Sequence, residues 1–124
     1  MKRVKISDAE WAVMEVVWNH PGWTASEIVS ELARTKSWTA NTIRTLLQRL
    51  VDKKALKSSK ATGALSFEPL LSREECVQQE SESFIERVFG GAAGSMLVHF
   101  VKQTELTPEE LNQLRQILKD KEGR

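Results

Sequence analysis

The sequence predicts a mostly α-helical protein with one small β-hairpin, an N-terminal winged helix-turn-helix followed by a C-terminal helical dimerisation region. Three observations predict this fold. Helix start signals recur along the chain, a short hairpin pattern follows the third predicted helix, and the character of the sequence changes near residues 70–72. We therefore expect two domains, over residues 1–71 and residues 72–124.

Charge is distributed unevenly along the 124 residues, although the formal net charge is only +1. Residues 1–72 carry eleven Lys and Arg against seven Asp and Glu, a balance of +4. Residues 73–124 carry seven against ten, a balance of −3. A basic front half and an acidic back half suggest two roles, of which only one involves a polyanion.

The composition excludes several other classes of protein. Hydrophobic residues make up 40% and charged residues 28%, as in a globular chain rather than a disordered one. The single Cys76 excludes an intrachain disulfide and a cysteine-built metal site. No apolar run reaches the length of a membrane span, and the N-terminus lacks the apolar core of a signal peptide, so we expect a cytoplasmic protein without membrane insertion.

No catalytic constellation is visible in the sequence. His20 lies beside a proline in a predicted turn, and His99 lies in an apolar helix where a packed histidine is the simpler interpretation. Glycine-rich phosphate loops, metal-spaced His and Cys sets and nucleophile motifs are missing. We therefore predict no enzyme activity, no cofactor and no metal site.

The first two predicted helices begin with capping boxes. Ser7 and Glu10 open a helix that is apolar around most of its circumference, which indicates a scaffold helix buried from several sides. Pro21 and Gly22 are expected to end it. Thr24 opens a second, shorter helix, and residues 35–38 read as a polar turn into the third. Two helices joined in this way predict a helix-turn-helix.

The third predicted helix follows Thr39, which can serve as its N-cap. Its apolar residues recur at three- and four-residue spacing and share one face: Ile43, Leu46, Leu47, Leu50 and Val51. The opposite face carries amides, hydroxyls and guanidinium groups, on Asn41, Thr45, Gln48 and Arg49, with Thr42 and Arg44 at its flanks. For an isolated helix, the solvated face of an ordinary core helix is the favoured interpretation, and the neighbouring elements change that balance.

A basic hairpin is predicted directly after this helix. Residues 56–60 and 65–68 resemble two short strands around a turn in which Gly63 supplies a positive φ. Lys57, Lys60 and Thr62 lie on or near its tip. The hairpin is either an edge ribbon whose lysines oppose aggregation, or the wing of a winged helix that touches phosphate. The preceding helix-turn-helix favours the wing.

Three amphipathic helices are predicted after residue 71, the first opened by a capping box at Ser72 and ended at residues 90–91, and the last with Pro108 at its first position. They are too short to bury their apolar stripes by themselves, so a second copy of the chain is the simplest partner, and folding back as a monomer is the alternative. The expected dimerisation residues are Phe84, Ile85, Val88, Phe89, Met96, Leu97, Phe100, Leu111, Leu114, Ile117 and Leu118.

These elements together predict a dimer that binds double-stranded DNA at a palindromic site. The residues expected in the major groove are Asn41, Thr42, Arg44, Thr45, Gln48 and Arg49, of which Asn41, Arg44 and Gln48 are the best candidates for base edges. The residues expected to hold phosphates are Thr24, Ser26, Thr39, Lys57 and Lys60. A winged helix used for protein contacts, without sequence-specific DNA binding, is the alternative.

The sequence also resembles the bacterial penicillinase-repressor family (BlaI/MecI/CopY). The resemblance rests on Ile-Ser-Asp-Ala-Glu-Trp at residues 6–11, Thr-Ile-Arg-Thr-Leu-Leu-Gln-Arg-Leu at 42–50, Val-Phe-Gly-Gly at 88–91 and Leu-Thr-Pro-Glu-Glu-Leu at 106–111. Ala55 and Ala64 depart from the family pattern, which usually has Gly at the first position and often a basic residue at the second.

The resemblance implies a dimeric repressor that blocks transcription from a palindromic operator. In the β-lactam-responsive branch, a membrane sensor-protease signal leads to cleavage in the C-terminal region, and the matching bond here joins His99, which replaces the family's Asn, to Phe100. The copper-responsive branch uses a cysteine-rich tail that this chain lacks. Antibiotic stress through proteolysis is therefore the inducing signal that the resemblance favours, with a metal or another signal as the alternative.

Overall fold

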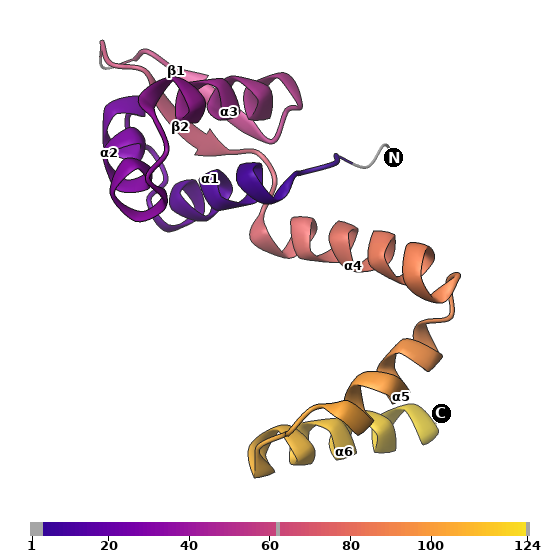
Figure 1. Cartoon of the computed structure of the whole chain (residues 1–124). Coiled ribbons are helices and arrows are strands. Elements are labelled where there is room, and N and C mark those ends of the chain that lie inside the picture. The colour runs from indigo at the N-terminus through magenta and orange to yellow at the C-terminus, as the bar shows by residue number, and fades with distance from the viewer. Residues whose placement is uncertain (1–3, 62, 124) are drawn as a thin grey trace. The chain divides into compact units, whose positions relative to one another are not determined.

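Helices dominate the fold, which is described by a computed structural model for residues 4–61 and 63–123 (Figure 1). The described chain forms two compact units, divided between Glu80 and Ser81. The elements in chain order are α1 (Asp8–Asn19), α2 (Ala25–Lys36), α3 (Ala40–Asp52), β1 (Leu56–Ser59), β2 (Ser66–Pro69), α4 (Arg73–Phe89), α5 (Ala93–Gln103) and α6 (Pro108–Glu122). The predicted fold class is confirmed. The predicted domain boundary at residues 71 and 72 falls at the start of α4 and stays a prediction.

Local hydrogen bonds fix the helix starts, as the sequence predicts. In each capping box the hydroxyl accepts a bond from the backbone N–H of a glutamate, whose carboxylate accepts one from the cap residue. These reciprocal bonds form at the starts of α1, α2, α4 and α6, and the pairs are Ser7 with Glu10, Thr24 with Glu27, Ser72 with Glu75, and Thr107 with Glu110.

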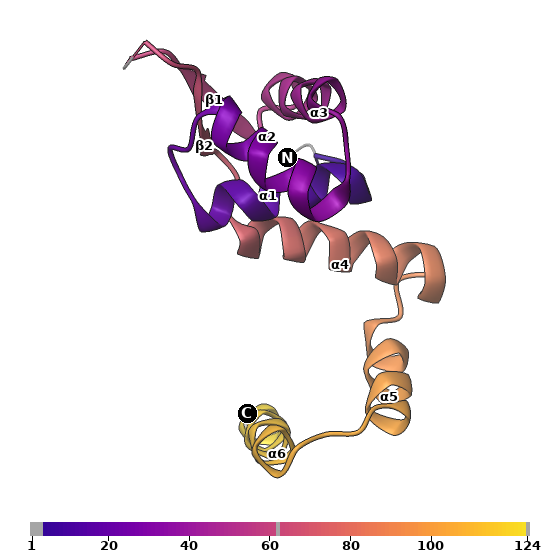
Figure 2. The same ribbon diagram turned by 60° about the vertical axis from the view of Figure 1, so that its left-hand side comes forward.

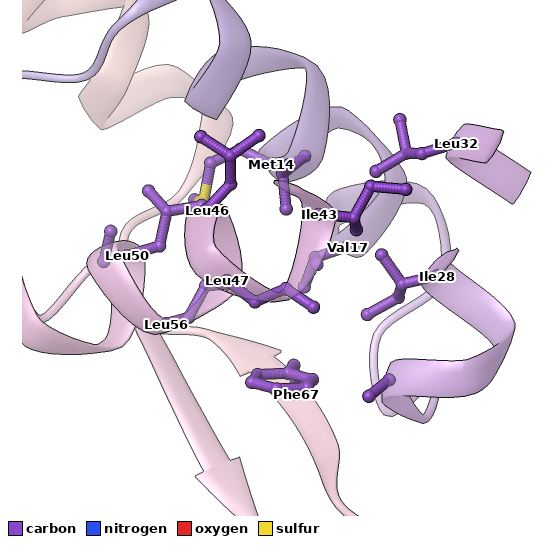
Figure 3. Packing of buried hydrophobic residues seen from close by; sticks show 13 residues of the cluster. Met14, Val17, Ile28, Leu32, Ile43, Leu46, Leu47, Leu50, Leu56 and Phe67 are labelled. Atoms are coloured by element: carbon purple, nitrogen blue, oxygen red, sulfur yellow. The ribbon is translucent and has the colours of Figure 1, made fainter. Parts of the chain in front are cut away.

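The core of the first unit lies between α1, α2, α3 and the hairpin, which contact one another. Figure 3 shows side chains from all of these elements meeting in one cluster. Its fully or almost fully buried members are Val13, Met14, Val17, Ala25, Ile28, Leu32, Ile43, Leu46, Leu47, Leu50, Ala55, Leu56 and Phe67. Burying each large apolar side chain contributes roughly 1.5–3 kcal/mol, so this cluster holds α3 in place from its inner face.

The hairpin is antiparallel, with Leu56 paired to Pro69 and Ser59 to Ser66. Gly63 has φ +88°, the positive value that the sequence predicts for the turn. The connection from α1 to α2, predicted only as a turn, adds a short third pairing to the hairpin: the N–H of Gly22 donates to the carbonyl of Phe67 at 2.8 Å. Figure 2 shows the hairpin tip extending beyond the three helices.

Several predicted boundaries are wrong by one or two residues. The helix α2 continues through Lys36, although a turn is predicted from residue 35, and the hydroxyl of Thr35 donates to the carbonyl of Glu31 one turn back at 3.0 Å. The change of direction falls on Ser37, which has φ +59°. β1 ends at Ser59 rather than at residue 60, and β2 starts at Ser66 rather than at residue 65.

The second unit contains the end of α4, together with α5 and α6. Gly90 and Gly91 end α4 with φ values of +59° and +88°, as the sequence predicts. Aromatic rings join α4 to α5, with 6.3 Å between the ring centroids of Phe84 and Phe100. Among the described residues, no single helix is long and apolar enough to cross a membrane, although α4 and α5, taken together across a bend, meet that requirement by length and composition.

Candidate nucleic-acid interface

The helix α3 has two chemically distinct faces. Thr39 caps it, because the Thr39 hydroxyl accepts a hydrogen bond from the N–H of Thr42 at 3.2 Å. Four of the five residues of the apolar face are buried, as the spacing predicts, and Val51 is half-buried. The polar side chains are all exposed, and besides Asp52 they are the six expected in the major groove: Asn41, Thr42, Arg44, Thr45, Gln48 and Arg49. The sequence therefore identifies both faces of this helix correctly.

Positive charge on the outer face of α3 is available to a ligand. Within the described residues, neither Arg44 nor Arg49 forms an ion pair. Arg49 also lines a shallow depression of about 310 Å³ whose other lining residues are Asn41, Thr42, Thr45 and Leu46. An exposed surface with free guanidinium groups, amides and hydroxyls suits the edges of bases and the phosphates beside them.

Three of the predicted contact residues already form side-chain hydrogen bonds in α3 or at its N-cap. The hydroxyl of Thr39 donates to that of Thr42 at 3.0 Å. The amide nitrogen of Gln48 donates to a carboxylate oxygen of Asp52 at 2.9 Å. The second bond joins residues four positions apart on one helix face, a spacing that is visible in the sequence and could have indicated the pair.

A partly buried ion pair joins the C-terminal end of α3 to the start of α1. The ammonium of Lys53 lies 2.6 Å from the carboxylate of Glu10 and 2.6 Å from the carbonyl oxygen of Lys5. Glu10 is only 2% exposed. Burial raises its pKa, but hydrogen bonds from Lys53 and Ser7 outweigh burial and hold the pKa below its ordinary value. Sequence reasoning missed this pair because nothing local links residues so far apart.

The predicted phosphate contacts on α2 differ in their surroundings. Thr24 is half-buried, and its hydroxyl takes part in the capping box with Glu27. Ser26 is exposed and lines a groove of about 410 Å³ on α2. The same groove contains Glu27, and it contains Arg34, whose guanidinium is paired with Glu31 at 2.8 Å.

The hairpin places two lysines on exposed positions. Lys57 lies on β1 directly across from Glu68 on β2, whereas Lys60 follows the end of β1 at the turn. The carbonyl of Lys60 accepts a hydrogen bond from the N–H of Gly63 at 2.9 Å, which closes the turn. Thr62, which is also predicted near the tip, lies outside the described residues.

The first turn of α4 is fastened to α1 by a second charged cluster. The guanidinium of Arg73 donates to the carboxylate of Glu15 and lies 4.9 Å from the ring centroid of Trp18. The indole of Trp11 donates to the same carboxylate at 3.1 Å. The bond from Arg73 lowers the pKa of Glu15. No local sequence pattern predicts this cluster, because Glu15 and Arg73 are 58 residues apart.

The predicted dimerisation residues lie in the second unit, where α5 and α6 bury no residue. Leu97 and Leu118 are the most exposed, at 58% and 59%. Phe84, Ile85, Phe89, Met96 and Leu114 are partly buried, while Val88, Phe100, Leu111 and Ile117 are exposed. His99 is also exposed, and its ring meets that of Phe100 edge to face at 5.4 Å. The unit therefore displays a large apolar surface.

Comparison with known proteins identifies relatives of this chain. The family described as penicillinase repressor matches residues 6–120. The chain is 36% identical to the penicillinase repressor of Bacillus licheniformis over 125 residues, which cover 100% of this chain and 98% of that protein. It is 37% identical to the DNA-binding domain of the repressor BlaI in solution, with a TM-score of 0.55, over 60% of this chain and 93% of that one. The Bacillus licheniformis BlaI monomer in complex with the blaP half-operator gives a TM-score of 0.54 at 37% identity and the same coverage.

Proposed function

The chain belongs to the penicillinase repressor family, and on this premise we propose that it is a DNA-binding transcriptional repressor that occupies a palindromic operator as a homodimer. The observation that carries the proposal is the outer face of α3, where exposed amides, hydroxyls and two guanidinium groups without ion pairs among the described residues project from a helix held by the core. Such a helix enters the major groove in winged-helix proteins.

In this proposal, the residues of the interface divide into two groups. Asn41, Arg44 and Gln48 read base edges, because amides and guanidinium groups can bond two atoms of a base at once. Lys57 and Lys60 on the hairpin hold phosphates, together with Thr24, Ser26 and Thr39, and these contacts set the position on the duplex rather than the sequence. The remaining residues of the outer face lie in the major groove beside the three that read base edges; they are Thr42, Thr45 and Arg49.

The homodimer is proposed from the apolar surface of the second unit. Leucine, isoleucine and phenylalanine side chains on α5 and α6 are exposed in the single chain, with Leu118 at 59% and Ile117 at 51%. A twofold interface would cover the same surface on both copies and present two α3 helices to the two halves of a palindrome.

We also propose that repression ends when this dimer surface is cut, as the family resemblance implies. The bond between His99 and Phe100 lies inside α5, and the carbonyl of Phe100 accepts a helical hydrogen bond from the N–H of Thr104 at 2.9 Å. Cleavage there separates Phe100 and α6 from the rest of the chain and so divides the apolar surface. A sensor-protease pathway responding to a stress such as a β-lactam would supply the signal.

The first test is selection of bound sequences from random duplex DNA at a salt concentration near physiological. We expect an enriched inverted repeat, and an affinity that falls steeply as salt is raised, because Lys and Arg release counterions from phosphates. Binding that is insensitive to salt, with no enriched sequence, would refute the proposal and favour a winged helix that contacts protein.

The dimer is tested separately by sedimentation velocity of the full chain carrying Leu97→Asp. A charge placed on the apolar surface of α5 should convert the dimer to a monomer, and the monomer should bind a single half-site as well as it binds the palindrome. Gln113→Glu is the control, because it adds one negative charge at an exposed polar position of α6. A dimer that survives Leu97→Asp would place the interface elsewhere.

A further inference from the structure

Asp52 occupies a position that is electrostatically unfavourable in two ways. It is the last residue of α3, where the helix dipole presents partial negative charge and disfavours an acid. It also shares an outward stripe of the helix with Asn41, Thr45 and Gln48, since these residues follow at three- and four-residue steps. This stripe is the surface proposed to meet a polyanion.

The contact that Asp52 makes is with the proposed base reader Gln48. The amide nitrogen of Gln48 donates to the Asp52 carboxylate at 2.9 Å, and both side chains are exposed. A carboxylate only accepts hydrogen bonds, so the nitrogen of Gln48 must face Asp52 and its amide oxygen must face away. A pair of this kind stabilises a helix only slightly, which makes stability a weak reason for an acid at this place.

We infer that Asp52 is a positioning residue that sets the base preference of the protein through Gln48. The inference rests on the proposed function and deepens it. With one N–H held by Asp52, Gln48 presents its oxygen and its second N–H to the groove. These two groups match adenine, whose N6 donates and whose N7 accepts, and the oxygen conflicts with guanine, which offers only acceptors. Holding the side chain beforehand also removes part of the entropy lost on binding.

The experiment applies the same random-duplex selection to four full-length proteins: the wild type, Asp52→Ala, Gln48→Ala and the double variant. Wild type should prefer adenine at one base pair in each half-site, and Gln48→Ala should lose that preference. Asp52→Ala should lower the preference for adenine by about 2- to 10-fold, which is the range expected for fixing one flexible side chain. Preferences at the other base pairs should stay unchanged. In the Gln48→Ala background, removal of Asp52 should have no further effect on preference.

If Asp52 acted only through its negative charge, the results would differ. If Asp52→Ala tightens binding to all sequences equally and leaves every base preference unchanged, with or without Gln48, the inference is overturned. A wild-type preference for guanine at the position that Gln48→Ala relaxes would contradict the assigned orientation of the amide. Absence of any enriched sequence with wild type would instead refute the proposed function itself, so the two failures are distinguishable.

Discussion

Replacing Lys53 by methionine should destabilise the first unit, because it leaves the carboxylate of Glu10 buried without its ammonium partner. The methionine keeps most of the aliphatic stem of the lysine and removes only the charge and the hydrogen-bond donors. In wild type, the ammonium nitrogen of Lys53 lies 2.6 Å from a carboxylate oxygen of Glu10 and also bonds the carbonyl oxygen of Lys5. Both hydrogen bonds are lost in the variant. The substitution therefore tests whether this pair fastens α3 to α1.

The magnitude follows from the exposure of the two partners. Removing one partner of a fully buried ion pair costs about 3–5 kcal/mol. The side chain of Lys53 is 36% exposed, however, so water screens the pair, and the carboxylate of Glu10 keeps its bond from the N–H of Ser7. We expect a loss of about 1–3 kcal/mol in the free energy of unfolding at neutral pH, as for a buried acceptor left unsatisfied.

The loss should depend on pH in a definite direction. Burial raises the pKa of Glu10, but the bonds from Lys53 and Ser7 outweigh it and hold the folded pKa below the ordinary value of 4.5. The pair therefore stabilises wild type fully above about pH 4.5 and fades as the pH falls through the lowered folded pKa. Without Lys53, its lowering of the Glu10 pKa is lost, so the pKa is higher than in wild type and the carboxyl is protonated more readily as the pH falls. The difference between the two proteins should be largest at pH 7 and smaller at pH 4.

Urea denaturation followed by tryptophan fluorescence is the appropriate assay. The four tryptophans lie at residues 11, 18, 23 and 38, so their emission reports on the first unit, and urea avoids the screening that a salt denaturant brings. Lys54→Met is the matched control, since Lys54 is exposed and forms no ion pair with described residues; it should change stability by less than about 0.5 kcal/mol. Equal losses for the two variants, or a Lys53→Met loss that is the same at pH 7 and pH 4, would refute this reasoning.

Three further predictions follow from the interface and the core. Arg44→Ala should remove about 1–3 kcal/mol of preference for the operator over random DNA, whereas Lys60→Ala should weaken binding to both about equally; equilibrium titrations on the two DNAs distinguish them, and equal losses for Arg44→Ala would contradict the division of labour. Arg73→Ala should speed the reaction of Cys76 with a thiol reagent. Burial raises the pKa of that thiol, and Arg73 holds the same end of α4 against α1, so losing the contact should expose the thiol; an unchanged rate would show that the contact does not hold the helix. Phe67→Ala should cost about 3–5 kcal/mol of unfolding free energy in the urea assay, since its ring is 3% exposed and joins β2 to the core, and a loss below about 1 kcal/mol would mean that the hairpin is not held by this side chain.

Much of the fold is readable from the sequence because the relevant interactions are local. A capping box involves residues three positions apart, so the starts of α1, α2 and α6 follow directly from Ser7, Thr24 and Thr107. Helical spacing likewise separates the buried and exposed faces of α3. The positive φ of Gly63 and the break at residues 90–91 are again properties of single positions.

The tertiary structure alone decided how these elements are fastened together. The Glu10 and Lys53 pair joins residues 43 positions apart, and the Glu15 and Arg73 bond joins residues 58 positions apart. The backbone pairing that adds residues 22–24 to the hairpin also depends on chain segments that meet only after folding. Charged residues at such separations carry no periodic signal, because their partners are set by packing of the core rather than by spacing along the chain. The sequence therefore determined which surface of α3 faces outward, and the folded structure determined what holds that surface in place.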